Sequence, residues 1–373
     1  MKYFKQITVL FFVSTFILGC ARQPQKKDST SIEDTIDTLI EEALQKHNIS
    51  ALSIGYIQDG KIKMLKGYGV LSKNNDSTVD ENSIYQIASQ SKMFTGIIAN
   101  RLINENKLEL TASIVKYLKE DLNKEAQEKL RAITLKNLIQ HTSGIPGNVC
   151  LPYKLRKEGD HWADGYTKEE LIQDLNTISL EFEPGTKFQY SNSGYAILGY
   201  ICEKVSGEKY ETLLTNYITK EYRFKNTVVS LDNTQKTLLV TPYRKDNRTI
   251  ETKPSVMGMA TPASAIYSNA KDLTQLLQRQ LKSYRDYYTS KSSFLVLTHH
   301  TADMGKNLEY GFGLIKQSEK TYTKYGHGGD ADGFACEYFF IPEQNKGLVL
   351  LTSSGGKWLG ELAESILTLK VAK

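Results

Sequence analysis

Two segments near the start of the chain have regular apolar patterns. Apolar residues recur at helical spacing from Ser31 to about His47, which predicts an amphipathic helix with a capping serine and an acidic first turn. From Leu52 to Met64 they alternate with polar residues on both sides of Asp59-Gly60, a pair typical of tight turns. We therefore expect a helix followed by a β-hairpin.

Alternation returns near the other end. Strands are expected over residues 310–316 and 321–328, followed by a hairpin with strands 333–341 and 347–352. Residues 359–369 carry apolar side chains at helical spacing. Both chain ends thus supply strands and one helix.

The middle of the chain is mostly helical in pattern, with a short helix over 133–140 and an apolar helix over 194–205, whereas 231–260 and 281–306 are polar and expected to be irregular. The sequence therefore predicts an α+β fold. One antiparallel sheet, from about 31–88 and 307–373, is flanked by the two terminal helices, and a mostly helical region of about 89–306 is inserted. A cleft between sheet and helical region is the expected place for a site.

The first 19 residues have the pattern of a targeting segment. A short basic start precedes an apolar run over residues 7–18, which is too short to span a bilayer comfortably. The run ends in Ile17-Leu18-Gly19-Cys20, which resembles the lipobox of bacterial lipoproteins, so Cys20 is the expected lipidation site. A plain secretory signal or an uncleaved anchor are the alternatives. We expect a polar tether over 20–30, one domain over 31–373, and lipid anchoring in a bacterial envelope on its periplasmic or extracellular face.

Composition narrows the classes of partner. The chain has 373 residues, 40% hydrophobic and 24% charged, with a net charge of +5 and no basic cluster, so nucleic acid is not an expected partner. Besides Cys20, the cysteines Cys150, Cys202 and Cys336 form neither a disulfide framework nor a zinc pattern. The histidines lack ligand spacing as well. No metal and no cofactor are expected, and the sequence leaves the oligomeric state open.

A serine and a lysine three residues apart on a helix share one face, and a neutral amine there can activate the hydroxyl as a nucleophile. Ser89-Gln90-Ser91-Lys92 has this pattern at the expected start of a helix. The spacing alone is weak, because it recurs at Ser113/Lys116, Ser206/Lys209, Ser268/Lys271 and Ser354/Lys357.

Two companion motifs distinguish the first pair. Tyr190-Ser191-Asn192 offers a phenol that can move a proton and an amide that can orient a lysine or bind a carbonyl. Tyr267-Ser268-Asn269 matches the same pattern. His327-Gly328-Gly329 ends an expected strand, and its glycines would let a substrate lie along the strand edge.

These three motifs, in this order, resemble those of the serine β-lactamase and penicillin-binding-protein superfamily. The branch most similar holds class C β-lactamases, D-Ala-D-Ala peptidases, D-amino-acid peptidases and related esterases. The resemblance covers about residues 34–370 and includes the blocks at 87–95, 133–144, 184–195, 267–273 and 310–314. It implies a β-lactamase/transpeptidase-like fold and makes the 267–269 block structural.

The resemblance also implies roles. Ser89 attacks a carbonyl, Lys92 and Tyr190 exchange protons, and the backbone N–H groups of Ser89 and Asp330 hold the oxyanion. The substrate-binding residues it suggests are Asn192, His327, Gly329, Asp330 and Gln90. For His327 a structural role remains a rival, and for Gln90 a solvent-facing role.

The chain departs from class C β-lactamases at His327, where those enzymes carry lysine. A histidine is mostly neutral at pH 7 and suits a substrate carboxylate less well, which favours a peptidase or esterase. Asp330 and Asp332 add negative charge that could favour an amine-bearing substrate, although exposed loop acids are the simpler interpretation. The expected function is an envelope serine hydrolase acting on peptide, amide or ester bonds, with compounds that contain D-amino acids as expected substrates. The alternatives are a penicillin-binding sensor that acylates without turnover, a true class C-like β-lactamase, and an inactive envelope lipoprotein.

Overall fold

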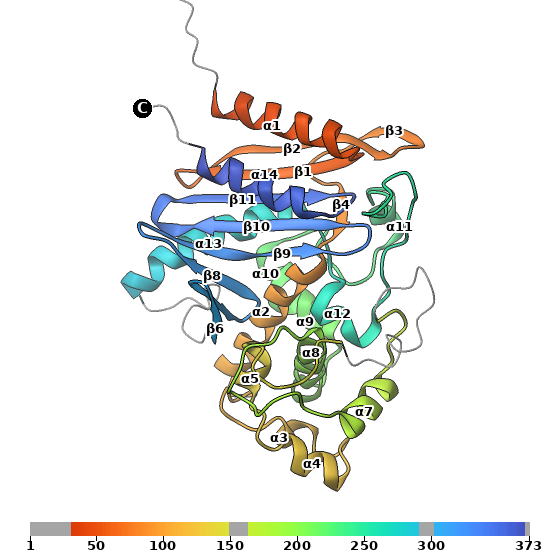
Figure 1. Ribbon diagram of the computed structural model, residues 1–373, viewed down its shortest axis with the longest axis vertical. Coiled ribbons are helices and arrows are strands. Elements are labelled where there is room, and N and C mark those ends of the chain that lie inside the picture. Colours follow the sequence, from red (N-terminus) through yellow and green to blue (C-terminus); the bar gives the residue numbers. More distant parts are fainter. Residues whose placement is uncertain (1–30, 149–162, 291–301, 370–373) are drawn as a thin grey trace, which may run out of the picture. The chain divides into compact units, whose positions relative to one another are not determined.

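One antiparallel sheet brings strands from both ends of the chain together (Figure 1). The computed structural model describes residues 31–148, 163–290 and 302–369. Within these ranges the spatial order of the strands is β3 (Asn75–Thr78), β2 (Lys61–Ser72), β1 (Ala51–Gln58), β11 (Lys346–Thr352), β10 (Ala335–Ile341), β9 (Thr323–Asp330), β8 (Leu314–Ser318), β7 (Leu308–Gly311) and β6 (Ala302–Gly305).

Helices cover both faces of this sheet. Ile54 of β1 pairs with Leu350 of β11, and both pack with α1 (Ile32–His47) and α14 (Lys357–Thr368) on one face. The neighbouring pair contributes Val349 to the opposite face, which packs against α13 (Ala270–Ser290). Because alternate residues of a strand point to opposite faces, the near-continuous apolar pattern of β11 follows from burial on both sides. The predicted antiparallel sheet flanked by the two terminal helices is confirmed.

The inserted region is mostly helical, also as predicted. Its elements are η1 (Ala88–Gln90), α2 (Ser91–Asn104), α3 (Val115–Leu118), α4 (Lys124–Leu130), α5 (Leu135–Ile139), α7 (Lys168–Thr177), α8 (Asn192–Ser206), α9 (Tyr210–Leu214), η2 (Thr215–Thr219), α10 (Lys220–Tyr222), α11 (Asn233–Lys236), η3 (Gly258–Ala260) and α12 (Thr261–Ser264). A small second sheet pairs β4 (Ile84–Gln86) with β5 (Tyr267–Asn269), and a 3-10 turn, η4 (Pro342–Gln344), connects β10 to β11. No helix in the described ranges is long and apolar enough to cross a bilayer.

Two sequence predictions of secondary structure are wrong. The single strand expected over 310–316 is a hairpin, β7–β8, because Phe312 (φ 52°) and Gly313 (φ 79°) reverse the chain in left-handed conformations. The stretch expected to be irregular over 281–306 is helical as far as Ser290, as a continuation of α13, and its residues Ala302–Gly305 form the edge strand β6. Its polar residues do not break the helix, since they include good helix formers such as lysine and arginine.

The β7–β8 turn also fixes the start of α2. A Cβ atom on Gly313 would lie 2.3 Å from the carbonyl oxygen of Lys92, and one on Gly96 would lie 2.1 Å from that of Phe312. Such contacts are too short for any side chain, so these two glycines let the turn lie directly on the first turns of α2. The sheet thereby holds the helix that carries Lys92 and directly follows Ser89.

Candidate active site

Ser89 lies in η1, at a sharp turn between β4 and α2. The residue before it, Ala88, has a φ of 44°, a left-handed conformation that costs energy for a residue with a Cβ atom. Between Ser83 and Ala99, Ser89 is the one residue that is not buried. The strained turn thus presents the Ser89 hydroxyl at the surface while its neighbours remain in the core.

Lys92 is fully buried, and its Nζ atom faces three oxygen atoms. It lies 3.2 Å from Ser89 Oγ, 2.7 Å from Asn192 Oδ1 and 2.8 Å from the carbonyl oxygen of Ala263. Three acceptors match the three donors of an ammonium. When the amine is neutral, two N–H groups suffice for Asn192 and Ala263, and the lone pair can face Ser89.

Burial lowers the pKa of Lys92 well below its ordinary value, because the charged form loses its hydration. The Nζ atom contacts the dipoles of Asn192 and Ala263 and lies 4.7 Å from the centre of the Tyr190 ring. Lys92 has no carboxylate partner among the described residues. A neutral Lys92 is therefore accessible, and it is placed to take the proton of Ser89.

The ring of Tyr190 lies 4.7 Å from Lys92 Nζ. Its hydroxyl is buried and has no hydrogen-bond partner of good geometry among the described residues. Burial raises the pKa of Tyr190, and the nearby Ser89 hydroxyl offsets only part of this effect. Tyr190 is thus a protonated phenol at neutral pH, suited to donate a proton.

The start of α8 positions Tyr190 and Asn192. Ser191 caps this helix, because its Oγ accepts from Gly194 N at 3.0 Å and donates to the carbonyl oxygen of Pro146 at 2.9 Å. Asn192 Nδ2 donates to Asn148 Oδ1 at 2.9 Å, which leaves Oδ1 to accept from Lys92. The cap and the asparagine pair together fix the orientation of the amide.

His141 is hydrogen-bonded to this turn. Its Nδ1 accepts from Ser191 N at 3.1 Å, and its ring lies 4.4 Å from those of both Tyr190 and Tyr310 between centroids. Burial, followed by the charges of Lys92 and His327, lowers the pKa of His141 well below its ordinary value. A neutral His141 can keep accepting the Ser191 N–H group, which makes it a positioning residue for the 190–192 turn.

Replacing His141 with phenylalanine should slow acylation of Ser89 roughly ten- to a hundredfold, because the turn shifts when Ser191 N loses its acceptor. His141→Asn, whose Oδ1 can take the place of Nδ1, should recover much of the rate. Labelling kinetics with an acylating probe measure both variants. Equal rates for phenylalanine and asparagine would show that the hydrogen bond has no positioning role.

His327 lies on β9 and is buried beside the site. Its Nδ1 contacts the carbonyl oxygen of Gly328, which requires the proton on Nδ1, and its Nε2 lies 3.3 Å from Tyr310 Oη. Burial, together with the charge of Lys92, lowers the pKa of His327 to about 3. The imidazole is therefore neutral at pH 7, and both ring nitrogens already have partners.

The last residues of β9 form an open edge. β8 pairs with β9 only up to Gly326, whereas β10 continues to Asp330. Ala331 N donates to the carbonyl oxygen of Phe334 at 2.9 Å, so these two residues form a hydrogen-bonded pair. Hydrogen-bonded and non-hydrogen-bonded pairs alternate along an antiparallel ladder, so the next pair, Asp330 with Ala335, is non-hydrogen-bonded. The N–H group of Asp330 consequently points to the open edge, as an oxyanion donor requires.

Gly329 allows this edge to approach the nucleophile turn. A Cβ atom there would lie 2.6 Å from the carbonyl oxygen of Ile87 and 2.9 Å from Ala88 Cβ. The Asp330 side chain is exposed, and its Oδ1 lies 3.6 Å from Lys245 Nζ. The backbone of Asp330 thus faces the site, while its carboxylate is partly neutralised outside it.

Gln90 is buried, contrary to both roles considered for it. Its side chain is 0% exposed, so neither substrate nor solvent reaches it in this conformation. Both amide atoms lack a hydrogen-bond partner among the described residues. An unpaired buried amide destabilises a protein, so this residue lowers the stability of the nucleophile turn.

Gln90→Met should therefore raise the free energy of unfolding by about 1–3 kcal/mol, since it removes an unpaired polar group at similar volume. Gln86→Met is the matched control. Gln86 is buried too, but its amide bonds both Ser255 N and the carbonyl oxygen of Ser255 at 2.8 Å, so this change should destabilise. Denaturant unfolding measures both, and a loss of stability in Gln90→Met would mean that its amide is satisfied.

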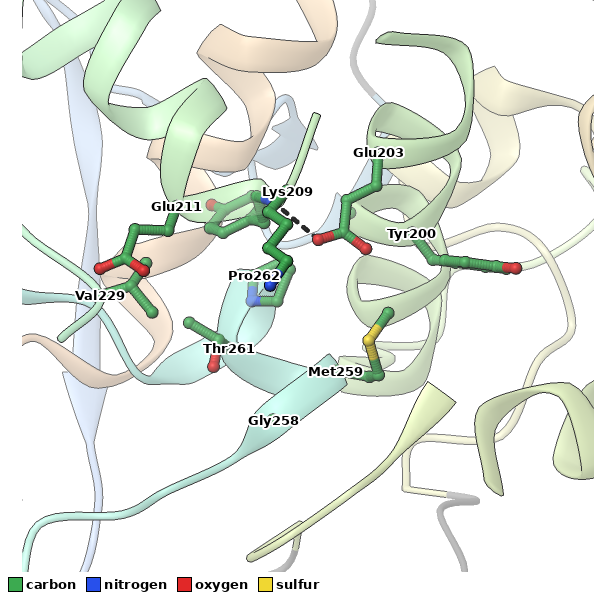
Figure 2. Close-up of a pocket in the computed structure, with 11 residues that line it drawn as sticks. Tyr200, Glu203, Lys209, Glu211, Val229, Gly258, Met259, Thr261 and Pro262 are labelled. Atoms are coloured by element: carbon green, nitrogen blue, oxygen red, sulfur yellow. Dashed lines mark hydrogen bonds between the residues drawn. The ribbon is translucent and has the colours of Figure 1, made fainter. Parts of the chain in front are cut away.

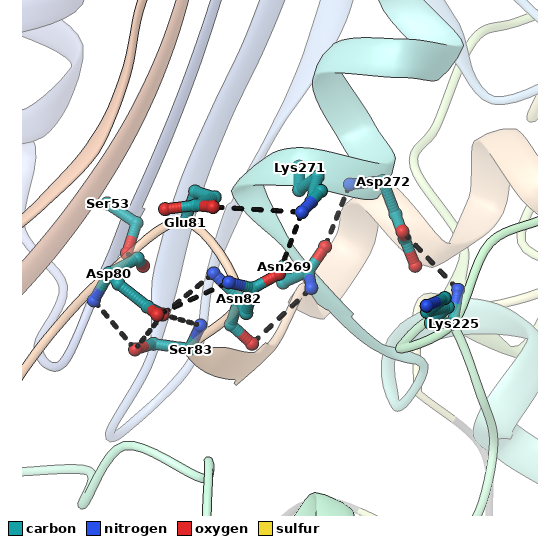
Figure 3. Close-up of polar contacts among 9 residues, drawn as sticks. All are labelled: Ser53, Asp80, Glu81, Asn82, Ser83, Lys225, Asn269, Lys271 and Asp272. Carbon is teal, nitrogen blue, oxygen red and sulfur yellow. Dashed lines mark hydrogen bonds and ion pairs between the residues drawn. The ribbon is translucent and has the colours of Figure 1, made fainter.

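In the second Tyr-Ser-Asn match, the side chain of Asn269 is hydrogen-bonded to backbone groups of the fold (Figure 3). Asn269 Nδ2 donates to the carbonyl oxygen of Asn82 at 3.3 Å, and Asn269 Oδ1 accepts from Asp272 N at 2.8 Å. Asp272 in turn accepts from Asn226 N at 2.8 Å. These bonds join β5 to the start of α13, as the sequence resemblance implied.

Sequence reasoning missed two groups at the site. The carbonyl oxygen of Ala263 carries no side-chain signal, because any residue at that position could supply it. Asn148 lies after the block at 133–144, outside the motifs from which the site was predicted. His141, which positions the 190–192 turn, lies within that block, and its place in the motif was the sequence signal for a role at the site.

Comparisons with known proteins identify the family of the chain. A sequence model of the family described as Beta-lactamase matches residues 36–369. The chain belongs to the beta-lactamase family. This family of serine hydrolases and penicillin-binding proteins is the one that the motifs predicted, and the predicted fold is confirmed with it.

Individual relatives are distant. Protein flp of Staphylococcus aureus strain MW2 is 27% identical over 340 residues, covering 90% of this chain and 66% of its own length. A beta-lactamase of Pseudomonas fluorescens is 26% identical over 250 residues, covering 67% of this chain and 65% of its own. The chain thus spans just under two thirds of these relatives.

A solved structure supports the fold. The octameric penicillin-binding protein homologue from Pyrococcus abyssi superposes with a TM-score of 0.74 and 24% identity, covering 88% of this chain and 75% of that one. At this identity the likeness concerns the fold.

Proposed function

We propose that this protein is a serine hydrolase that forms an acyl-enzyme on Ser89. The observation that carries the proposal is the buried Lys92 amine, 3.2 Å from the Ser89 hydroxyl and held by Asn192 and Ala263. A lysine without a carboxylate partner, buried next to a partly exposed serine, is an arrangement that activates a nucleophile. The order of motifs and the family membership support the same chemistry.

The reaction would proceed in two stages. Neutral Lys92 takes the Ser89 proton as Oγ bonds to the substrate carbonyl carbon, and the N–H groups of Ser89 and Asp330 hold the oxyanion. As the bond to the leaving group breaks, Tyr190 gives that group a proton and regains one from Lys92. Water then adds to the acyl carbon with the same groups in reverse order, which releases the acid and restores Ser89.

We further propose that the preferred substrates are esters, amides or peptides, including D-aminoacyl compounds, without a carboxylate next to His327. A neutral imidazole with two occupied nitrogens offers no cation to such a carboxylate. The open edge of β9 can pair with an extended substrate. Asp330 attracts an amine only weakly, because Lys245 lies 3.6 Å away.

A substrate panel tests this preference. D-aminoacyl amides and short-chain esters should be hydrolysed, with kcat/KM well above that for D-Ala-D-Ala peptides and for a chromogenic cephalosporin. Faster turnover of the cephalosporin would instead identify a β-lactamase. A labelled penicillin that stays bound to Ser89 with no hydrolysis of any substrate would identify a sensor.

The pH dependence of acylation follows from the shifted pKa values of Lys92 and Tyr190. Acylation needs neutral Lys92, whose pKa burial lowers, so the rate should rise with pH and reach its plateau below the ordinary pKa range of lysine. It also needs protonated Tyr190, whose pKa burial raises, so the plateau should extend into the alkaline range. A rate profile across pH measures both limbs, and a rate that still rises at the ordinary lysine pKa would contradict the neutral-base role.

We also propose that Cys20 carries the lipid that anchors the protein in the envelope. The lipobox-like end of the apolar run supports this proposal, and it lies outside the described residues. Cys20→Ala should move the protein from the membrane to the soluble envelope fraction. Unchanged membrane association in that variant would favour an uncleaved anchor.

A further inference from the structure

A second cavity lies among α8, α9 and α12, and Ser89 is not one of its lining residues (Figure 2). Its volume is about 160 Å³, and apolar groups of Tyr200, Val229, Met259 and Pro262 make up much of its wall. A dry cavity of about 150 Å³ is large enough to hold a benzene ring. The space therefore suits a small organic molecule.

The cavity has one carboxylate that is not exposed, that of Glu203. Glu203 is half-buried in its wall, and its Oε1 accepts from Tyr210 N at 2.7 Å, while no ion pair occupies it among the described residues. Burial raises the pKa of Glu203, and the hydrogen bond from Tyr210 N and the charges of Lys168 and Lys209 offset only part of this effect. Lys209 and Glu211, which also line the cavity, are exposed, and the charge of Lys209 acts on Glu203.

Two short connections lead from this cavity to α2. Tyr210 Oη lies 2.6 Å from Thr95 Oγ1, which also donates to the carbonyl oxygen of Pro262 at 2.6 Å. The next residue in α12, Ala263, supplies the carbonyl oxygen that binds Lys92 Nζ. A shift of Pro262 therefore reaches the amine that activates Ser89 through one peptide unit.

We propose that this cavity is a second ligand site for a small primary amine with an apolar body, and that its occupation changes the acylation rate at Ser89 through Pro262 and Ala263. The ammonium pairs with Glu203, and the apolar body packs on Val229, Met259 and Pro262. The coupling rests on the proposed function of Ser89, whereas the binding does not. Binding and coupling can accordingly fail separately.

Isothermal titration with benzylamine tests the binding. Saturable binding to the wild-type protein should weaken at least tenfold in Glu203→Gln, which keeps the acceptor for Tyr210 N but loses the charge. Val229→Trp, which fills the cavity, should weaken it as well, and benzyl alcohol should bind more weakly than benzylamine. Asp330→Asn is the matched control, because it removes an exposed carboxylate next to the first site and should leave this binding unchanged.

Two results would overturn the binding. One is equal affinity of wild type and Glu203→Gln, and the other is loss of binding in Asp330→Asn, which would place the amine in the cleft of Ser89. For the coupling, saturating benzylamine should change the labelling rate of Ser89 at least twofold in wild type and not in Glu203→Gln. An unchanged wild-type rate with benzylamine bound would refute the coupling, whereas absence of labelling with binding intact would count against the proposed function alone.

Discussion

Replacing Lys92 with methionine should lower acylation of Ser89 by roughly 10³-fold or more. The methionine side chain fills a similar volume, but it has no lone pair to take the hydroxyl proton. Because burying a lysine is unfavourable, the variant should remain folded despite leaving Asn192 Oδ1 and the Ala263 carbonyl without their donor. Single-turnover labelling measures the rate, and circular dichroism checks the fold.

Lys116→Met is the matched control, because Ser113 and Lys116 have the same spacing. Lys116 is exposed and pairs with Glu109 at 3.1 Å, so its loss should leave labelling unchanged. Retained acylation in a folded Lys92→Met protein would mean that another group takes the proton of Ser89.

Removing the hydroxyl of Tyr190 should separate amides from activated esters. In Tyr190→Phe, hydrolysis of amides should fall by about 10²–10⁴, because their leaving group needs a proton. A nitrophenyl ester, whose leaving group departs as an anion, should be acylated within about tenfold of the wild-type rate. The variant should be at least as stable as wild type, since the buried hydroxyl has no hydrogen-bond partner of good geometry among the described residues.

The measurement is the ratio of the amide activity to the nitrophenyl ester activity in each variant. Tyr217→Phe, which removes a hydroxyl bonded to Glu105 at 2.8 Å outside the site, should leave the ratio unchanged. An equal loss on ester and amide in Tyr190→Phe would assign the phenol to the serine proton rather than to the leaving group.

The parts of the fold that the sequence predicted are those with a simple period. Alternating and continuous apolar runs indicated the central strands, and the helical spacing of Ile36 and Ile40 indicated a helix on one face. The hairpin at Phe312 was missed, because a left-handed phenylalanine has no sequence signal. The length of α13 was missed because polar residues continue an amphipathic helix as readily as they form a loop.

For the site, the order of motifs predicted which side chains would meet but not how each is held. Lys92, Asn192 and Ser89 come together as expected, although 100 residues separate Lys92 from Asn192. The contribution of Ala263 could not be predicted, because a backbone carbonyl is common to all residues. The burial of Gln90 could not be predicted either, since it depends on how closely β9 packs over η1.

Mass spectrometry of the intact protein after reaction with a fluorophosphonate tests the central claim most directly. We predict a single adduct that peptide mapping places on Ser89, that is absent from Ser89→Ala, and that persists in Ser113→Ala. An adduct on another residue, or none on the folded wild-type protein, would contradict the assignment of Ser89 as the nucleophile.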